Sequence, residues 1–149
     1  MRGAAGPCDS NRGIAYQRHA GVCLEPLLQE RNFGDVRGTP YSELGVDLFA
    51  PDFEPPGGEG WEAFYVRVDA AWLRVRSVAQ RTRGTLAVVT HGLVCYSLAL
   101  RHLRLPAGVT PDPGIPITAL AVIERSSAFR ASLWDCAAHV DGAASYAPA

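Results

Sequence analysis

The feature that most constrains the fold is an apolar stripe along residues 61–78. Its members recur at steps of three and four residues, which is the spacing of a long amphipathic helix. A helix with such a stripe must pack its apolar side against a core, so the chain is globular. The stripe consists of Trp61, Phe64, Tyr65, Val68, Ala71, Trp72, Val75 and Val78. The other side carries five arginines, which predict a solvated face, with an anion-binding patch as the alternative. These are Arg67, Arg74, Arg76, Arg81 and Arg83.

The segment after this helix predicts an α/β unit. Residues 85–90, TLAVVT, form a short β-branched apolar run typical of a buried parallel strand. His91-Gly92 follow at once, and residues 93–103 have a helical pattern. Strand, tight turn and helix in this order are typical of an α/β domain.

Other segments fill in the outline. Thr39-Pro40 predicts the start of a short helix over residues 39–48. Residues 117–124 and 128–134 predict two strands. Pro/Gly-rich stretches at 52–60 and 106–116 predict loops. We find no internal repeat.

Size and composition favour one domain. A length of 149 residues with 48% hydrophobic residues predicts a single domain over 1–149, with loose ends at 1–9 and 141–149. A formal net charge of -1 predicts no general attraction to nucleic acid or anionic membranes. The apolar runs are far shorter than the ~20 residues that cross a bilayer. With no C-x-x-C pair, zinc-ligand spacing or secretory opening, we expect a reduced cytoplasmic protein without metal or cofactor.

Two places in the chain could carry chemistry. Thr90-His91-Gly92 lies where a strand meets a helix N-terminus, so free N–H groups and the imidazole could hold a phosphate group. The alternative is a histidine that only ends a strand. Glu30 could act as a general acid if burial raised its pKa, but Glu30 beside Arg31 could also be a plain surface ion pair.

Several spaced segments point to one family. Residues 28–38 (LQERNFGDVRG) are similar to L-x-E-R-x-F-G-x-x-x-G, and 55–64 (PPGGEGWEAF) to P-x-G-E-S, with Gly60 in place of Ser. Residues 87–92 (AVVTHG) resemble a strand that delivers an active-site histidine. Residues 117–124 (ITALAVIE) resemble N-T-A-L-T-V-x-E with Ile117 in place of Asn, and 134–140 more loosely resemble N-D-T-A-H-L. Together they resemble the histidine phosphatase superfamily, which contains phosphoglycerate mutases and the broad-specificity and α-ribazole phosphatases.

The resemblance implies an α/β fold with a three-layer, mostly parallel sheet flanked by helices, truncated at its N-terminus. It also implies phosphoryl transfer in two steps through a phosphohistidine. By this resemblance His91 matches the histidine that stabilises the phosphate, and the Gly92 N–H assists it. Glu30 matches the acid that protonates the leaving alkoxide.

One family motif has no counterpart. The family opens with an apolar strand that ends in the nucleophilic R-H-G, and no such segment precedes residue 28. Arg18-His19-Ala20 imitates it, so His19 is a weak candidate for the nucleophile, although no apolar run leads into it. Arg12 and Arg31 are weak candidates for binding phosphate. We expect His102 and His139 to be surface or packing residues.

The predicted function is hydrolysis of a small phosphorylated metabolite, impaired by the missing nucleophilic segment. The alternatives are a noncatalytic phosphate-binding or interaction protein, as a pseudoenzyme or remnant, and a phosphoglycerate-mutase-like phosphotransferase. Without the opening strand, apolar and unpaired backbone groups would face water. We therefore expect low stability alone, or a homo-oligomer or partner strand that completes the sheet.

Overall fold

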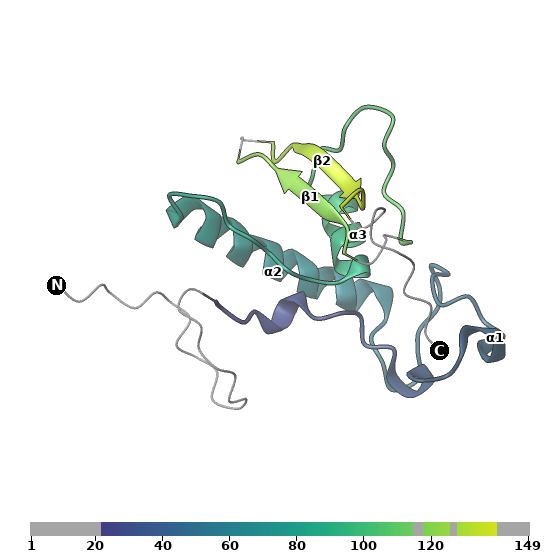
Figure 1. Cartoon of the computed structure of the whole chain (residues 1–149). Coiled ribbons are helices and arrows are strands. Elements are labelled where there is room, and N and C mark those ends of the chain that lie inside the picture. Colours follow the sequence, from purple (N-terminus) through teal and green to yellow (C-terminus); the bar gives the residue numbers. More distant parts are fainter. Residues whose placement is uncertain (1–21, 115–117, 126–127, 140–149) are drawn as a thin grey trace.

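The computed structural model describes residues 22–114, 118–125 and 128–139. In Figure 1 the long helix α2 runs across the molecule, α3 crosses it, and a two-stranded sheet lies beside α3. The described residues thus combine helices with a small sheet. The elements are η1 (Pro26–Leu28), η2 (Gly34–Val36), α1 (Tyr41–Leu44), α2 (Trp61–Arg81), α3 (Gly92–Arg101), β1 (Leu120–Ile123) and β2 (Ala131–Cys136).

Helix α2 confirms the helix predicted from the apolar stripe. It begins directly after the Pro/Gly-rich loop, with Gly60 as an N-cap whose side chain can accept no hydrogen bond. It ends at Thr82, whose backbone N–H donates to the carbonyls of Val78 and Ala79. The Thr82 hydroxyl also donates to the Val78 carbonyl at 2.8 Å, which closes the last turn.

The core lies between α2 and α3. Phe64, Val68 and Val94 are fully buried, and Trp72 contacts Phe129 edge-on with ring centroids 5.0 Å apart. Leu93 and Val94, the second and third residues of α3, belong to this core, so packing fixes the first turn of the helix. The core cluster is Trp61, Phe64, Val68, Trp72, Leu93, Val94 and Leu98.

The two strands predicted near the C-terminal end are confirmed with shifted bounds. β1 and β2 pair antiparallel, with Leu120 opposite Cys136 and Ile123 opposite Ala131. An isolated parallel bridge joins Arg104, just after α3, to Arg130. The small sheet is therefore tied to the end of α3.

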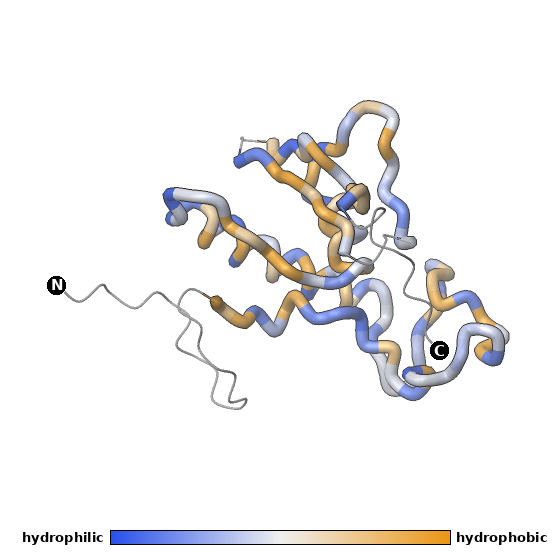
Figure 2. The backbone as a smooth tube through the Cα atoms, in the orientation of Figure 1, coloured by the Kyte–Doolittle hydropathy of each residue, from blue (hydrophilic) through white to orange (hydrophobic). Residues whose placement is uncertain are grey.

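The predicted parallel strand at 85–90 is wrong for this structure. The segment returns from α2 to α3 without strand structure, and Figure 2 shows it as an apolar stretch. The side chains of Val88 and Val89 are 41% and 92% exposed. Within the described residues, no backbone–backbone hydrogen bond joins 85–90 to another segment. A strand needs such a neighbour.

Two further expectations about the fold need correction. The described residues hold one two-stranded antiparallel sheet, so the three-layer, mostly parallel sheet is not found among them. The predicted helix at 39–48 is reduced to α1, because the chain turns at Gly45 with φ of 62°. The predicted loose ends 1–9 and 141–149 lie outside the described residues.

Two further observations concern the described helices and cysteines. None of the helices in the described part of the chain has the length and apolarity needed to cross a membrane. Cys95 and Cys136 carry free thiols.

Candidate active site

Glu30 lies against the first turn of α3. One carboxylate oxygen accepts a hydrogen bond from the backbone N–H of Leu93 at 3.4 Å, and the other accepts one from the N–H of Arg31 at 2.8 Å. The side chain is half-buried. The structure thus places Glu30 beside Gly92, at the positive end of the α3 dipole, which attracts anions.

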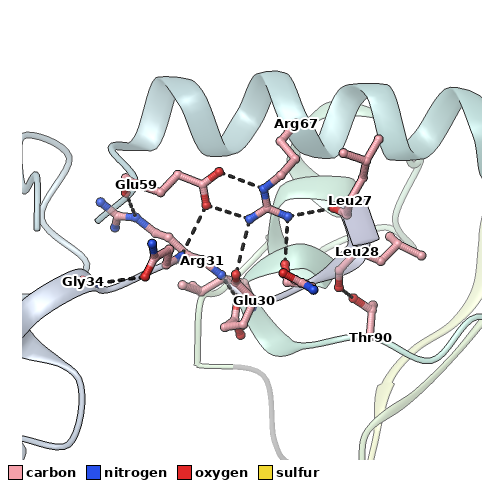
Figure 3. A network of polar contacts seen from close by, with 11 residues as sticks. Leu27, Leu28, Glu30, Arg31, Gly34, Glu59, Arg67 and Thr90 are labelled. Atoms are coloured by element: carbon pink, nitrogen blue, oxygen red, sulfur yellow. Dashed lines mark hydrogen bonds and ion pairs between the residues drawn. The ribbon is translucent and has the colours of Figure 1, made fainter. Parts of the chain in front are cut away.

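His91 is held at the same place by its neighbour. The Thr90 hydroxyl donates a 2.7 Å hydrogen bond to the carbonyl of Leu28, two residues before Glu30 (Figure 3). His91 is the extended N-cap of α3, its side chain forms no capping bond, and it is exposed. The imidazole is therefore accessible to a ligand, and the structure brings together the predicted residues His91, Gly92 and Glu30.

A single arginine holds the backbone that carries Glu30. The Arg67 guanidinium donates to the carbonyls of Leu27, Gln29 and Glu30 at 2.7, 2.9 and 3.3 Å. It also pairs with both carboxylate oxygens of Glu59 at 2.8 and 2.7 Å (Figure 3). Arg67 therefore fastens residues 27–30 to α2, and three backbone acceptors gain a charged donor.

The interpretation of the arginine face as solvated is wrong for Arg67. The side chain is 20% exposed, and it follows buried Phe64 by three residues on the border of the apolar stripe. Glu59 precedes α2 and lies eight positions before Arg67, outside the three- and four-residue spacings of helical ion pairs, so no spacing rule in the sequence identified the pair. Arg74 does reach solvent, with a 61% exposed side chain, although it also pairs with Glu25 at 3.0 Å.

Glu59 is held in its charged form by this network. Burial raises the pKa of Glu59, but the hydrogen bonds and charge of Arg67 and the Asn32 amide outweigh it, so the pKa lies below its ordinary value. The Glu59 carboxylate thus stays available to Arg67. The charge of Arg67 is balanced by Glu59, and the contact of Arg67 with Glu30 is to its backbone carbonyl. Arg67 therefore positions Glu30 through the backbone.

Arg31 is a structural residue and does not reach the site. Its guanidinium is inside the protein, with the residue 2% exposed, and its charge stacks 4.0 Å above the Trp61 ring. It donates to the carbonyls of Glu59, Leu48 and Phe53 at 2.8, 3.2 and 2.6 Å. The burial lowers the pKa of Arg31, against the charge of Glu59. Both earlier interpretations, phosphate ligand and surface ion pair, are corrected because every guanidinium nitrogen is already used.

Two glycine-containing loops meet beside these arginines. Gly34 has φ of 52°, and a Cβ there would overlap the Pro56 carbonyl and the backbone of Gly58. The Asp35 N–H donates to that Pro56 carbonyl at 2.8 Å, and the Glu59 N–H donates to the Asn32 carbonyl at 2.7 Å. The close approach explains why segment 28–38 requires glycine at position 34 and segment 55–64 requires it at position 58.

The other described histidines do not lie at the candidate site. His102 caps the far end of α3, about 16 Å from His91 at ~1.5 Å per residue. Its Nε2 lies 2.7 Å from Asp69, and its ring stacks on Trp72 at 5.5 Å, as expected of a packing residue. His139 is exposed. The weak candidates His19 and Arg12 lie outside the described residues.

Cys95 is a neighbour of the site that the sequence interpretation missed. It lies one turn into α3, and its N–H donates to the His91 carbonyl at 3.0 Å. Burial, and secondly the charge of Glu30, raise the pKa of the Cys95 thiol. The thiol is therefore neutral and contributes no negative charge beside Glu30.

Comparison with known proteins identifies the family of the chain. The sequence profile of the histidine phosphatase superfamily (branch 1) matches residues 9–135, most of the chain. The chain belongs to the histidine phosphatase superfamily. No curated protein sequence matches it. Membership in this superfamily supports an α/β fold class and a phosphatase- or mutase-type function.

Proposed function

We propose that this chain is a phosphomonoester hydrolase of the histidine phosphatase type. The observation that carries the proposal is the Glu30 carboxylate at the N–H of Leu93, in the first turn of the helix that His91 precedes. This juxtaposition supports a phosphate site and an acid within reach of its leaving group.

In the proposed first step, the phosphoryl oxygens accept hydrogen bonds from the His91 imidazole and the Gly92 N–H. A histidine nitrogen attacks phosphorus, an N–P bond forms and the bond from phosphorus to the leaving oxygen breaks. Glu30 gives its proton to that oxygen, which leaves as an alcohol. In the second step water attacks phosphorus, the N–P bond breaks, and the Glu30 carboxylate receives the proton of the water.

The position of Glu30 supports it as the acid. Its carboxylate lies at the N–H of Leu93, in the first turn of the helix that His91 precedes, so a phosphoryl group held there would have its leaving oxygen near this carboxyl group. Arg67 contacts Glu30 through the backbone carbonyl, and its guanidinium is paired with Glu59.

The proposed reaction also requires a histidine nucleophile. His102 lies at the wrong end of α3, and His19 in Arg18-His19-Ala20 is the nearest sequence imitation of the R-H-G motif. We infer that hydrolysis by these 149 residues is impaired and depends on His19. If His19 does not serve, His91, Gly92 and Glu30 form a noncatalytic phosphate-binding site.

Hydrolysis of 4-nitrophenyl phosphate by the purified chain tests the proposal. Wild type is compared with His91→Ala and His19→Ala, and with His139→Ala as a control for an exposed histidine outside the site. Circular dichroism verifies folding. We expect measurable turnover that falls by about 10²-fold or more in His91→Ala, is lost in His19→Ala, and is unchanged in His139→Ala.

The other outcomes separate the alternatives. A folded wild-type chain without turnover contradicts the hydrolase. Binding of vanadate or phosphate that is lost in His91→Ala then supports the noncatalytic site, and absence of binding contradicts both. Transfer of phosphate to a second alcohol in preference to water would support the mutase-like alternative.

A further inference from the structure

A small aromatic cavity lies where helices α2 and α3 meet two loops. It has a volume of about 180 Å³ and is lined by residues from the loop before α2, from α2, from α3 and from the loop after α3. None of these lining residues carries a charge, and four of the six are aromatic. They are Phe49, Pro51, Trp61, Tyr65, Tyr96 and Pro113.

The aromatic side chains of the cavity wall are held in place by contacts with one another and with residues behind them. The Trp61 indole N–H donates to the Ala50 carbonyl at 2.8 Å, and the Arg31 guanidinium lies 4.0 Å from the indole ring centre. Tyr65 stacks on Trp61 with ring centres 5.5 Å apart, and Tyr96 meets it edge-on at 6.5 Å. The aromatic rings are therefore pre-arranged in the absence of ligand.

The cavity and the residues that would handle phosphate share helix α3. Tyr96 lies one turn after Gly92 on α3, and side chains of a helix lean back over the preceding turn. Trp61, which also lines the cavity, stacks against the guanidinium of Arg31, the residue that follows Glu30. An ester whose phosphoryl group lies at the start of α3 would thus extend its alcohol portion toward the rings.

Size and polarity indicate what the cavity can hold. A protein cavity of about 150 Å³ lined by apolar residues is known to bind benzene. Burial raises the pKa of the Tyr65 phenol, as does the neighbouring Tyr96 secondarily, so the phenol stays a neutral donor. A polyhydroxylated or charged alcohol would lose its hydration against rings and prolines that offer few partners.

On this basis, and resting on the proposed phosphatase function, we infer that the cavity binds the leaving group of aromatic phosphomonoesters. The favoured alcohol is a single ring or an apolar group of similar size. Phe49, with a 40% exposed residue surface, lies at the solvent side of the cavity, so its side chain can be changed without disturbing the core.

Binding of p-cresol to the full chain, followed by ligand-observed NMR, tests the cavity without phosphate and without turnover. We expect wild type to bind p-cresol and Phe49→Ala to bind it about three- to tenfold more weakly. Tyr41→Ala is the matched control, because Tyr41 is a 74% exposed aromatic residue outside the cavity, and it should bind like wild type. No binding by wild type, or equal binding by Phe49→Ala, overturns the inference.

A second measurement separates this inference from the proposed function. Phenyl phosphate should bind wild type at least tenfold more tightly than glycerol 2-phosphate, and Phe49→Ala should reduce that ratio. His91→Ala should abolish the contribution of phosphate and leave p-cresol binding unchanged. If wild type binds p-cresol but His91→Ala does not weaken the binding of phenyl phosphate, the phosphatase function alone is contradicted. Equal binding of the two esters by wild type would contradict the substrate class.

Discussion

The Glu30 carboxylate and the backbone N–H of Leu93 lie within 3.4 Å, although 63 positions separate them in the chain. This contact joins the end of an irregular segment to the first turn of α3. A negative side chain is favourable there because the first N–H groups of a helix lack partners. The same location would suit a phosphate group, so Glu30 and a bound anion would share one set of donors.

Replacing Glu30 by Gln should remove the proton donor and keep the acceptor for Leu93. We expect hydrolysis of an alkyl phosphate to fall by about 10²–10⁴-fold, and hydrolysis of 4-nitrophenyl phosphate to fall far less, because its leaving group needs no proton. The measurement is kcat/KM across esters of increasing leaving-group pKa. Glu62→Gln, an exposed residue of α2, is the control. Equal losses on all esters would contradict the role of Glu30 as an acid.

Replacing Arg67 by Met should loosen the segment that carries Glu30. The substitution leaves three carbonyls and the Glu59 carboxylate without their donor, and we expect a loss of about 2–3 kcal/mol in the free energy of unfolding. Urea denaturation measures it. Arg37→Met, at an exposed arginine, should change stability by less than about 0.5 kcal/mol. Similar values for the two variants would show that the Arg67 contacts contribute little.

Replacing Gly34 by Ala should be more damaging than replacing Gly45. Both have positive φ, 52° and 62°, so both substitutions strain the backbone by about 1–2 kcal/mol. Only at Gly34 would the new Cβ meet the Pro56 carbonyl, whereas nothing lies within 4 Å at Gly45. The difference in unfolding free energy between the variants therefore measures the contact between the two loops. A difference near zero would mean that the loops separate easily.

Asp69 should make stability depend on pH in the acid range. The hydrogen bonds of Arg101, and also of His102, hold the pKa of Asp69 below its ordinary value. A group whose pKa is lower in the folded state stabilises fully above its unfolded pKa, about 3.9, and the contribution is lost as the pH falls through the folded value.

Urea unfolding of Asp69→Asn between pH 7 and pH 3 should show a smaller loss of stability on acidification than wild type. Some dependence should persist, because Glu59 also has a lowered pKa and acts in the same direction. Parallel curves for the variant and wild type would contradict the role of Asp69.

The unpaired segment at 85–90 should promote association of the chain with itself. Val89 is 92% exposed in an apolar stretch that has no described strand beside it, which favours pairing with another copy. We expect Val89→Lys to lower the associated fraction in sedimentation velocity at high protein concentration. Val66→Lys, at a 64% exposed valine on α2, is the control. If Val66→Lys lowers the associated fraction as much as Val89→Lys does, the added charge causes the decrease, and association through residues 85–90 is contradicted.

Sequence predictions were accurate for elements that depend on neighbouring residues and inaccurate for elements that need partners from distant segments. The stripe from Trp61 onward predicted α2 because one helix face must be buried whatever it packs against. Residues 85–90 had equally clear strand chemistry and formed no strand, because a strand also requires hydrogen-bond partners from elsewhere. Residues His91 and Glu30 were identified through their motifs, and the structure brings them together.

The sequence by itself determined the amphipathic helix, the turn at His91-Gly92 and the motifs that assign the chain to its superfamily. These depend on the order and spacing of neighbouring residues. Only the tertiary structure decided the roles of the arginines. Arg31 and Arg67 look alike in the sequence, but one is buried among three carbonyls and the other fastens the Glu30 segment to α2. The reason is that a guanidinium takes its function from acceptors contributed by distant segments, and folding alone brings those acceptors within reach.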